Sequence, residues 1–179
     1  HAGTYSGGIY IDDLAGQAFG RFGARGRGTF LRLELVDGIL QRNRRTARIV
    51  VRMLSMLGLL QGRVIDSAGG YGLLVRMLRD LGVDARWEDR YCDNLVARGF
   101  EAGVDEPADL LTAFEVMEHM VDPLAEMRRL SARAPHVLVS TSLIPEPTPA
   151  LAAWWYYAPA GGQHIGFFRA RTLQYIAAR

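Results

Sequence analysis

The chain has 179 residues, of which 49% are hydrophobic and 22% are charged, and its formal net charge is +2. These values are typical of one globular domain with a buried core, and the small charge gives no reason to expect a polyanionic partner. The single cysteine, Cys92, excludes an internal disulfide and a cysteine-based zinc cluster. Because no apolar run reaches membrane-spanning length and no signal peptide pattern opens the chain, we expect a cytoplasmic protein without membrane contact.

The first 36 residues contain many glycines and scattered aromatic side chains without a clear period. We therefore expect an irregular N-terminal arm or lid over residues 1–36 and a single domain over residues 37–179. A helix is predicted over residues 37–60, because Asp37 can cap it and apolar side chains such as Val50 and Leu54 recur at helical spacing.

From residue 63 onward, short apolar segments alternate with amphipathic ones, a pattern typical of a parallel sheet with helical crossovers. Strands are predicted at residues 63–67, 84–88, 109–114 and 136–141. Helices are predicted at residues 71–81, 92–98 and 121–132 and, after a proline-rich break, at 169–178. The expected fold class is α/β, with a mostly parallel sheet flanked by helices.

The stretch "VIDSAGGYG", residues 64–72, ends the first predicted strand in an acid that is followed by glycines. Open α/β sheets bind ligands at the carboxyl ends of their strands, where the N–H groups of a helix N-terminus face the ligand. A second acid, Asp89, ends the next strand, where a carboxylate can accept both hydroxyls of a ribose. Asp89 can also cap the helix predicted at 92–98. The two acids and the glycine turn together predict a nucleoside-containing cofactor.

A dinucleotide cofactor does not fit this turn. Its G-x-G-x-x-G fingerprint, started at Gly70, needs a third glycine where the chain has Val75. Asp66 would also lie close to a pyrophosphate and repel it. A carboxylate at the base of the turn favours a cofactor with a cationic end, such as the amino group of a methionine moiety.

These motifs resemble those of the class I S-adenosylmethionine-dependent methyltransferases, in their broad bacterial small-molecule group. The family motif D/E-x-G-x-G-x-G is matched by residues 66–72, with Ala68 in place of the first glycine, and its second acid is matched by Asp89. The stretches "DLLTAFEVMEHMVDP" and "GQHIGFFRARTLQYIA" are similar to the segments after the family's fourth strand and in its later loop. The resemblance spans roughly residues 50–179. It implies a Rossmann-like sheet in the order 3-2-1-4-5-7-6, of which the final β-hairpin would be incomplete here.

The resemblance implies S-adenosyl-L-methionine as cofactor, S-adenosyl-L-homocysteine as product and a small molecule as methyl acceptor, with a hydroxyl group on a sugar or natural product as the expected target. The cofactor-binding residues that it implies are Asp66, Ser67, Ala68, Gly69, Gly70, Tyr71, Gly72, Asp89, Arg90, Phe114 and Glu115. Glu115 can instead cap a short helix after the fourth strand. Phe100 either flanks the adenine or packs in the core.

His164 is the predicted catalytic residue. It follows the glycine-rich stretch "WWYYAPAGGQ", and a histidine can take the proton of an acceptor hydroxyl near neutral pH. Gln163 would orient the acceptor, and His119 is the next catalytic candidate; a histidine packed among aromatic side chains is the alternative for His164. Glu118 and His119 either line the pocket or form a surface pair. Because no third ligand is visible beside them, we expect no metal site.

The arginine-rich segment Arg42–Arg52 leaves a second function class open, a nucleic-acid-binding or nucleic-acid-methylating protein. A solvated helix face is the commoner cause of such a run, so we expect no nucleic-acid partner. A third possibility is a catalytically inactive domain that keeps the cofactor fold without an acceptor site. The sequence gives no indication of oligomeric state.

Overall fold

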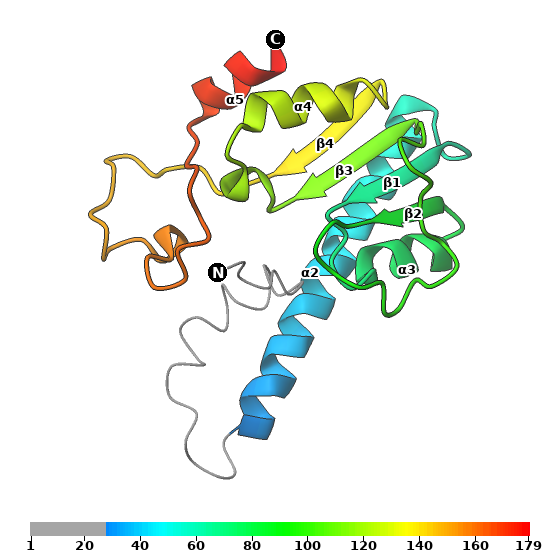
Figure 1. Ribbon diagram of the computed structural model, residues 1–179. Coiled ribbons are helices and arrows are strands. Elements are labelled where there is room, and N and C mark those ends of the chain that lie inside the picture. The colour runs from blue at the N-terminus through cyan, green and yellow to red at the C-terminus, as the bar shows by residue number, and fades with distance from the viewer. Residues whose placement is uncertain (1–27) are drawn as a thin grey trace.

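The structure is a computed structural model that describes the backbone of residues 28–179 and the side chains from residue 38 onward (Figure 1). Its centre is a four-stranded parallel sheet in the order β2-β1-β3-β4. The strands are β1 (Arg63–Ser67), β2 (Asp84–Glu88), β3 (Leu110–Phe114) and β4 (His136–Ser140). This arrangement confirms the predicted α/β Rossmann-like fold, and each strand lies within one residue of its predicted bounds.

The sheet reproduces the 2-1-4-5 part of the strand order that the resemblance implied. Beyond β2, the next pairing in the described residues is one parallel bridge between Trp87 and Glu101, so the segment that would form the third strand is reduced to a single bridge. The arrowheads of the strands point to the same side of the sheet, where the ligand site of a parallel sheet is expected (Figure 1).

Four α-helices and two 3-10 helices accompany the sheet in the described part of the chain. They are α2 (Gly28–Leu57), α3 (Leu73–Asp80), η2 (Met117–His119), α4 (Pro123–Ser131), η3 (Trp155–Tyr157) and α5 (Ala170–Ala177). Over the same residues, no helix has both the length and the apolar character that crossing a bilayer requires.

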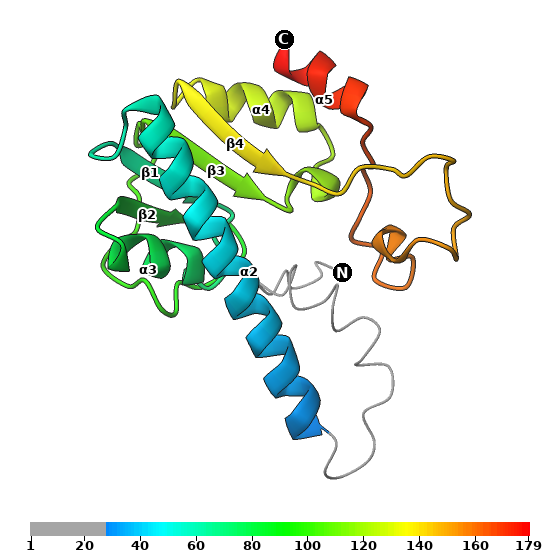
Figure 2. The ribbon, with the colours of Figure 1, turned by 180° about the vertical axis from the view of Figure 1, so that it is seen from behind.

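Both faces of the sheet are covered. Neighbouring residues of a strand point to opposite sides, so each strand contributes side chains to two separate cores. Val64 of β1 and Leu110 of β3 are buried in one core, together with side chains of α2 and α3. Ile65 and Leu111, one position further along each strand, are buried in a second core with Leu130 of α4. Figure 2 shows α2 running across the first of these faces.

The helix predicted over residues 37–60 begins earlier than expected, at Gly28, and ends at Leu57. The preceding residues include good helix formers such as leucine, arginine and glutamate and contain no proline, so the helix continues through Asp37 instead of starting there. The boundary placed at residue 36 therefore falls inside α2, and most of the expected arm, residues 1–27, lies outside the described residues. Val50 and Leu54 are fully buried, as their spacing predicted.

The prediction of a helix over residues 92–98 is wrong, because this segment forms a loop. The side chain of Asn94 closes it: its Oδ1 accepts the Ala97 N–H at 2.9 Å, and its Nδ2 donates to the Ala97 carbonyl at 2.8 Å. Such local bonds compete with the hydrogen bonds of a helix. The loop packs against the glycine turn, since a Cβ atom on Gly72 would lie 2.8 Å from Asn94 Oδ1.

Candidate functional site

The turn between β1 and α3 is built from backbone conformations that side chains disfavour. The φ angles of Ala68, Gly70 and Gly72 are +64°, +54° and +87°. These are the three glycine positions of the D/E-x-G-x-G-x-G motif, so the spacing of the motif follows from the alternating left-handed conformation. Ala68 occupies the first position at a cost of roughly 1–2 kcal/mol in backbone strain.

Gly69, between two of these positions, has no space for a side chain. A Cβ atom there would lie 2.9 Å from Trp87 Cδ1 and 3.1 Å from Asp66 Oδ2. The turn is therefore folded tightly over the first acid and over the end of β2. Gly69, Tyr71 and Gly72 shape the turn, whereas Ser67, Ala68 and Gly70 line the adjacent pocket.

Asp66 lies buried beneath the turn, with 4% of its surface exposed, and its Oδ1 accepts the Thr112 hydroxyl at 2.6 Å. Burial raises the pKa of Asp66 to about 7, against the opposing effect of the Thr112 hydrogen bond and with a further rise from the charge of Asp89. A positive charge brought near this carboxyl would favour its ionised form.

Asp89 connects the second acid of the sequence to the glycine turn. Its Oδ2 accepts the Gly70 N–H at 2.8 Å, and its Oδ1 accepts the N–H groups of Tyr91 at 2.7 Å and Cys92 at 2.9 Å. A carboxylate offers about four acceptor positions, so the side chain is held in place and keeps capacity for a further donor. The helix that Asp89 was to cap in the alternative interpretation does not form.

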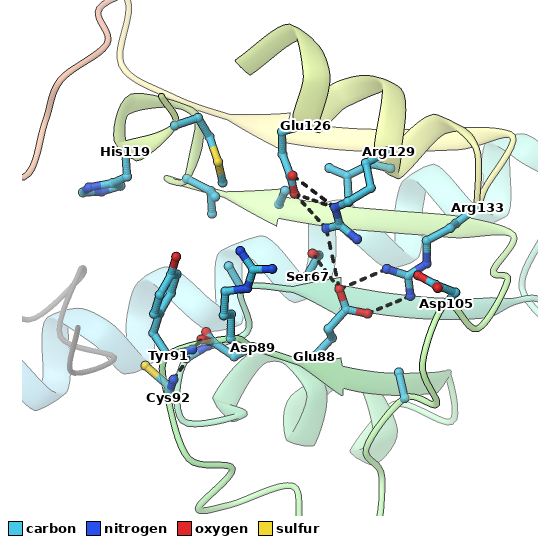
Figure 3. Close-up of a pocket in the computed structure, with 18 of the residues that line it drawn as sticks. Ser67, Glu88, Asp89, Tyr91, Cys92, Asp105, His119, Glu126, Arg129 and Arg133 are labelled. Carbon is cyan, nitrogen blue, oxygen red and sulfur yellow. Dashed lines mark hydrogen bonds and ion pairs between the residues drawn. The ribbon is translucent and has the colours of Figure 1, made fainter. Parts of the chain in front are cut away.

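A pocket of about 670 Å³ opens at the carboxyl ends of the strands (Figure 3). Its wall comes from the glycine turn, the exit of β2 with Asp89 and Arg90, the loop at residues 102–105, η2 and α4. This volume lies within the range of small-molecule sites. Figure 3 shows Tyr91 and His119 toward one end of the pocket and Glu88, with its arginine partners, toward the other.

The end of the pocket at Glu88 is an ion-pair network that the sequence did not reveal. Arg133 donates two hydrogen bonds to the Glu88 carboxylate, at 3.0 and 2.7 Å, and Arg129 lies 3.7 Å from it. Burial alone would raise the pKa of Glu88, but the hydrogen bonds and charges of the two arginines outweigh burial and lower it. Arg129 lies in the last turn of α4 and Arg133 just beyond its end. Their four-residue spacing was the available signal, and it does not identify their partner.

Cys92 also lines the pocket, and its thiol is not activated. Burial, together with the charges of Asp89 and Asp93, raises the pKa of Cys92 to about 11. The thiolate that nucleophilic chemistry requires is therefore scarce at neutral pH.

Phe114 and Glu115, at the end of β3, do not line this pocket. Glu115 has a φ of +53°, and its carboxylate accepts the hydroxyl of Ser140 at 2.7 Å and that of Tyr156 at 3.0 Å. It does not cap η2, whose N-cap residue is Val116. Strained backbone of this kind is concentrated at functional sites, so Glu115 remains a candidate site residue although it does not line the pocket.

The two aromatic candidates for the cofactor site pack on the hydrophobic core next to α2 and α3. These are Phe100 and Phe114, both partly buried. The guanidinium of Arg79 lies 3.6 Å from the centre of the Phe100 ring, so Phe100 has a packing partner away from the pocket.

His164 comes together with Glu118 and His119 in the structure, although it lies far from these two neighbouring residues in the sequence. The loop that carries His164 returns to η2, where the N–H groups of Ile165 and Gly166 donate to the Glu118 carbonyl at 2.8 and 2.9 Å. The rings of His119 and His164 then meet edge to face, with centroids 4.8 Å apart. His119 lines the pocket, and His164 lies next to it with 6% of its surface exposed.

The Glu118 side chain is fully buried, so a surface pair with His119 is excluded. Its Oε1 accepts the hydroxyl of Tyr156, itself fully buried, at 2.6 Å. Burial raises the pKa of Glu118, although the Tyr156 hydrogen bond opposes that rise. Burial, reinforced by the bond to Glu118, also raises the pKa of Tyr156 above its ordinary value. The pair is thus a buried polar network beside the pocket.

The arginine-rich part of α2 differs in character from this network. Arg44, Arg45, Arg48 and Arg52 are all exposed, as on a solvated helix face.

Comparison with known proteins gives a family match. A family model with the description "Methyltransferase domain" matches residues 39–179. Comparison with curated proteins gives no match.

Comparison with solved structures finds two methyltransferases. One is magnesium protoporphyrin IX methyltransferase (ChlM) from Synechocystis PCC 6803 with bound SAH, with 16% identity, a TM-score of 0.59, and coverage of 98% of this chain and 84% of that chain. The other is CalO1, a methyltransferase in calicheamicin biosynthesis in its SAH-bound form, with 17% identity, a TM-score of 0.43, and coverage of 94% and 61%. At 16% identity, the likeness to ChlM concerns the fold alone.

Proposed function

The chain belongs to the methyltransferase-domain family and is a class I S-adenosylmethionine-dependent methyltransferase, and we propose that it methylates a hydroxyl group of a small molecule. The observation that carries the proposal is the position of His119, which lines the pocket and has ligand atoms of Glu118 and His164 within 4.8 Å of its own. ChlM is named for magnesium protoporphyrin IX, a small molecule, which is in line with a small-molecule acceptor here. We also propose residues 37–179 as the catalytic unit, because the family match begins at residue 39.

The residues present fit the cofactor. The glycine turn brings Ser67, Ala68 and Gly70 to the wall of the pocket, where a ligand can approach closely. Asp89 has acceptor capacity left for a ribose hydroxyl. In this proposal the cationic amino group lies toward Asp66, whose raised pKa makes it responsive to such a charge. Arg90 borders the nucleoside, while Phe114 and Glu115 lie near the methionine end. When bound, the cofactor supplies an electrophilic methyl group.

The chain must orient the acceptor and remove its proton. His164 Nδ1 lies 2.6 Å from the Tyr156 carbonyl, and because a carbonyl only accepts hydrogen bonds, Nδ1 carries the proton and Nε2 the lone pair. The same argument applies to His119, whose Nδ1 lies 3.0 Å from the Gln163 carbonyl. In the metal-free protein, His164 takes the hydroxyl proton on Nε2, with His119 as the alternative base. Gln163 orients the acceptor and, through its carbonyl, also holds His119.

A panel of acceptors tests this proposal. Sugars, nucleotide sugars and phenols are incubated with the protein and S-adenosylmethionine, and release of S-adenosylhomocysteine is measured. Each active acceptor is compared with an analogue whose hydroxyl groups are already methylated. We expect release with the free hydroxyl and none with the blocked analogue. A product methylated on nitrogen or carbon would overturn the hydroxyl assignment, and tight cofactor binding without turnover of any acceptor class would favour an inactive domain.

A further inference from the structure

Glu118, His119 and His164 each offer one ligand atom, and these atoms lie within 4.8 Å of one another. The sequence showed only the first two, and no metal site was expected because a third ligand was missing. The structure supplies it through the returning loop. We propose that these three residues bind a divalent transition-metal cation, for which Zn²⁺ is the reference, at the edge of the pocket; this rests on the proposed function of the same site.

The two imidazoles are held as metal-binding histidines are. His119 and His164 each direct Nδ1 to a backbone carbonyl, at 3.0 and 2.6 Å, which places the lone pair on Nε2. Histidines that bind metals almost always donate their other ring N–H to a carbonyl or carboxylate, because this bond fixes the tautomer and the ring orientation. The two rings meet edge to face, and one nitrogen of each lies within 4.8 Å of the other and of a Glu118 carboxylate oxygen.

The carboxylate of Glu118 completes the donor set. Its Oε1 is held by the Tyr156 hydroxyl, while its Oε2 is buried and has no hydrogen-bond partner among the residues that the structure describes. A buried oxygen without a partner costs free energy, and a cation would remove that cost. Glu118 Oε1 lies 4.0 Å from His119 Nε2, so the negative charge of the carboxylate is close to one of the proposed imidazole ligands.

A second carboxylate increases the local negative charge. Glu115 Oε2 also lies within reach of the Tyr156 hydroxyl, at 3.0 Å, and one phenolic proton cannot serve both carboxylates. Within residues 38–179, no arginine forms an ion pair with either glutamate. A bound cation balances this buried charge.

Two imidazole nitrogens and one carboxylate oxygen match the ligands of zinc sites that keep one position open for a water or substrate. Bond lengths of about 2.0–2.2 Å separate neighbouring ligands by roughly 3.4 Å in a tetrahedral site. The three side chains therefore draw together by roughly 1 Å on binding. The groups that support them, the Tyr156 hydroxyl and carbonyl and the Gln163 carbonyl, all come from one short segment of the chain.

Because His119 lines the pocket, an acceptor hydroxyl can take the open position on the cation. The cation lowers the pKa of that hydroxyl, and its proton leaves to solvent. The freed oxygen lone pair then bonds to the methyl carbon as the C–S bond breaks, and that electron pair returns to sulfur. In the metal-bound protein the imidazoles hold the cation and do not take the proton.

Metal binding is measured directly on chelator-treated protein. Zn²⁺ is titrated by calorimetry into the wild type and the variants Glu118→Gln and His164→Gln, with His136→Gln, on β4 outside the cluster, as the control. We expect one equivalent of Zn²⁺ in the wild type and in the control, and affinity at least ~100-fold lower in the two cluster variants. Co²⁺ in the wild type should give the visible absorption of a low-coordinate site.

Titration of S-adenosylhomocysteine into the same preparations separates this inference from the proposed function. A wild type that takes up no cation, or a Glu118→Gln variant that binds Zn²⁺ as tightly as the wild type, overturns the metal site and leaves cofactor binding intact. Cation uptake without cofactor binding overturns the proposed function instead. Glu118→Gln keeps an acceptor for Tyr156 and nearly the same shape, so it decides the question if His164→Gln does not fold.

Discussion

The Asp89 carboxylate accepts the backbone N–H of Gly70 at 2.8 Å, which joins the acid at the end of β2 to the glycine turn after β1. The two motifs that point to the cofactor are therefore one unit in the structure. Its other oxygen holds the loop at Tyr91 and Cys92. A cofactor hydroxyl that donates to Asp89 therefore meets a side chain that is already held in place. Binding then costs little conformational entropy at Asp89.

Replacing Asp89 by alanine is expected to weaken S-adenosylhomocysteine binding by about 1.5–3 kcal/mol, because the ribose hydroxyls lose a charged acceptor. Asp93→Ala, an exposed acid in the same loop, is the control and should bind normally. Calorimetric titration of both variants measures the difference. Equal affinity in Asp89→Ala and the wild type would show that the ribose lies elsewhere.

The strands and the glycine turn could be predicted because their signals are local. Apolar runs of strand length and the acid–glycine pattern depend on neighbouring residues alone. The loop at 92–98 could not be predicted, because Asn94 closes it through its own side chain and it packs against the turn. The cluster of His164 with Glu118 was also invisible, since it depends on a loop returning to η2 through backbone hydrogen bonds that carry no sequence signal.

Gly72→Ala is expected to destabilise the fold more than Gly82→Ala does. Both glycines have φ near +85°, at +87° and +84°, so both variants carry roughly 1–2 kcal/mol of backbone strain. Only at Gly72 would the new Cβ also meet Asn94 Oδ1 at 2.8 Å and the Ala97 Cβ at 3.0 Å; nothing lies within 4 Å at Gly82.

Urea unfolding of these two variants isolates the contact from the strain. We expect the Gly72→Ala loss to exceed the Gly82→Ala loss by about 1–3 kcal/mol, the usual cost of overpacking. The cofactor affinity of Gly72→Ala should fall as well, because the glycine turn has to shift to make room for the new Cβ atom. Equal losses in the two variants would mean that the loop at 92–98 gives way without cost.

The contribution of Asp66 to the stability of the protein without cofactor should fall as the pH rises from about 4 to about 7. The folded protein binds a proton at Asp66 with a pKa of about 7, against an ordinary value of 3.8, so the stabilisation is complete below the ordinary pKa and is lost as the pH passes the folded one. The loss amounts to roughly 4 kcal/mol in total. Asp66→Asn, which keeps an acceptor for Thr112, should lack this part of the dependence.

Unfolding curves at several pH values, with and without S-adenosylhomocysteine, measure the effect. If the amino group of the ligand lies near Asp66, the ligand favours the ionised carboxylate, and its apparent affinity rises with pH in the wild type and not in Asp66→Asn. Parallel stability profiles for the wild type and the variant would contradict the raised pKa. Parallel affinity profiles would place the amino group away from Asp66.

His164→Ala is expected to lower turnover by roughly 10²–10⁴-fold on an acceptor that the wild type methylates. The loss follows whether His164 takes the proton itself or holds the cation that acidifies the hydroxyl. Affinity for S-adenosylhomocysteine should change little, because His164 lies outside both the glycine turn and the Asp89 loop. Ile165→Ala is the control, since this neighbouring side chain is 56% exposed and its backbone bond to Glu118 is unaffected by the substitution.

Melting temperature and turnover measured on the same preparations distinguish chemistry from packing. If His164 only fills space among aromatic side chains, His164→Ala melts at a lower temperature and keeps a near-normal rate per folded molecule. If it acts in the reaction, the rate falls far more than the folded fraction does, and Ile165→Ala keeps both. Added Zn²⁺ then separates the two chemical roles: it raises the rate of the chelator-treated wild type if His164 is a ligand and leaves it unchanged if His164 is the base. A folded His164→Ala variant with normal turnover would remove this residue from the mechanism, leaving Glu118 and His119 to act alone.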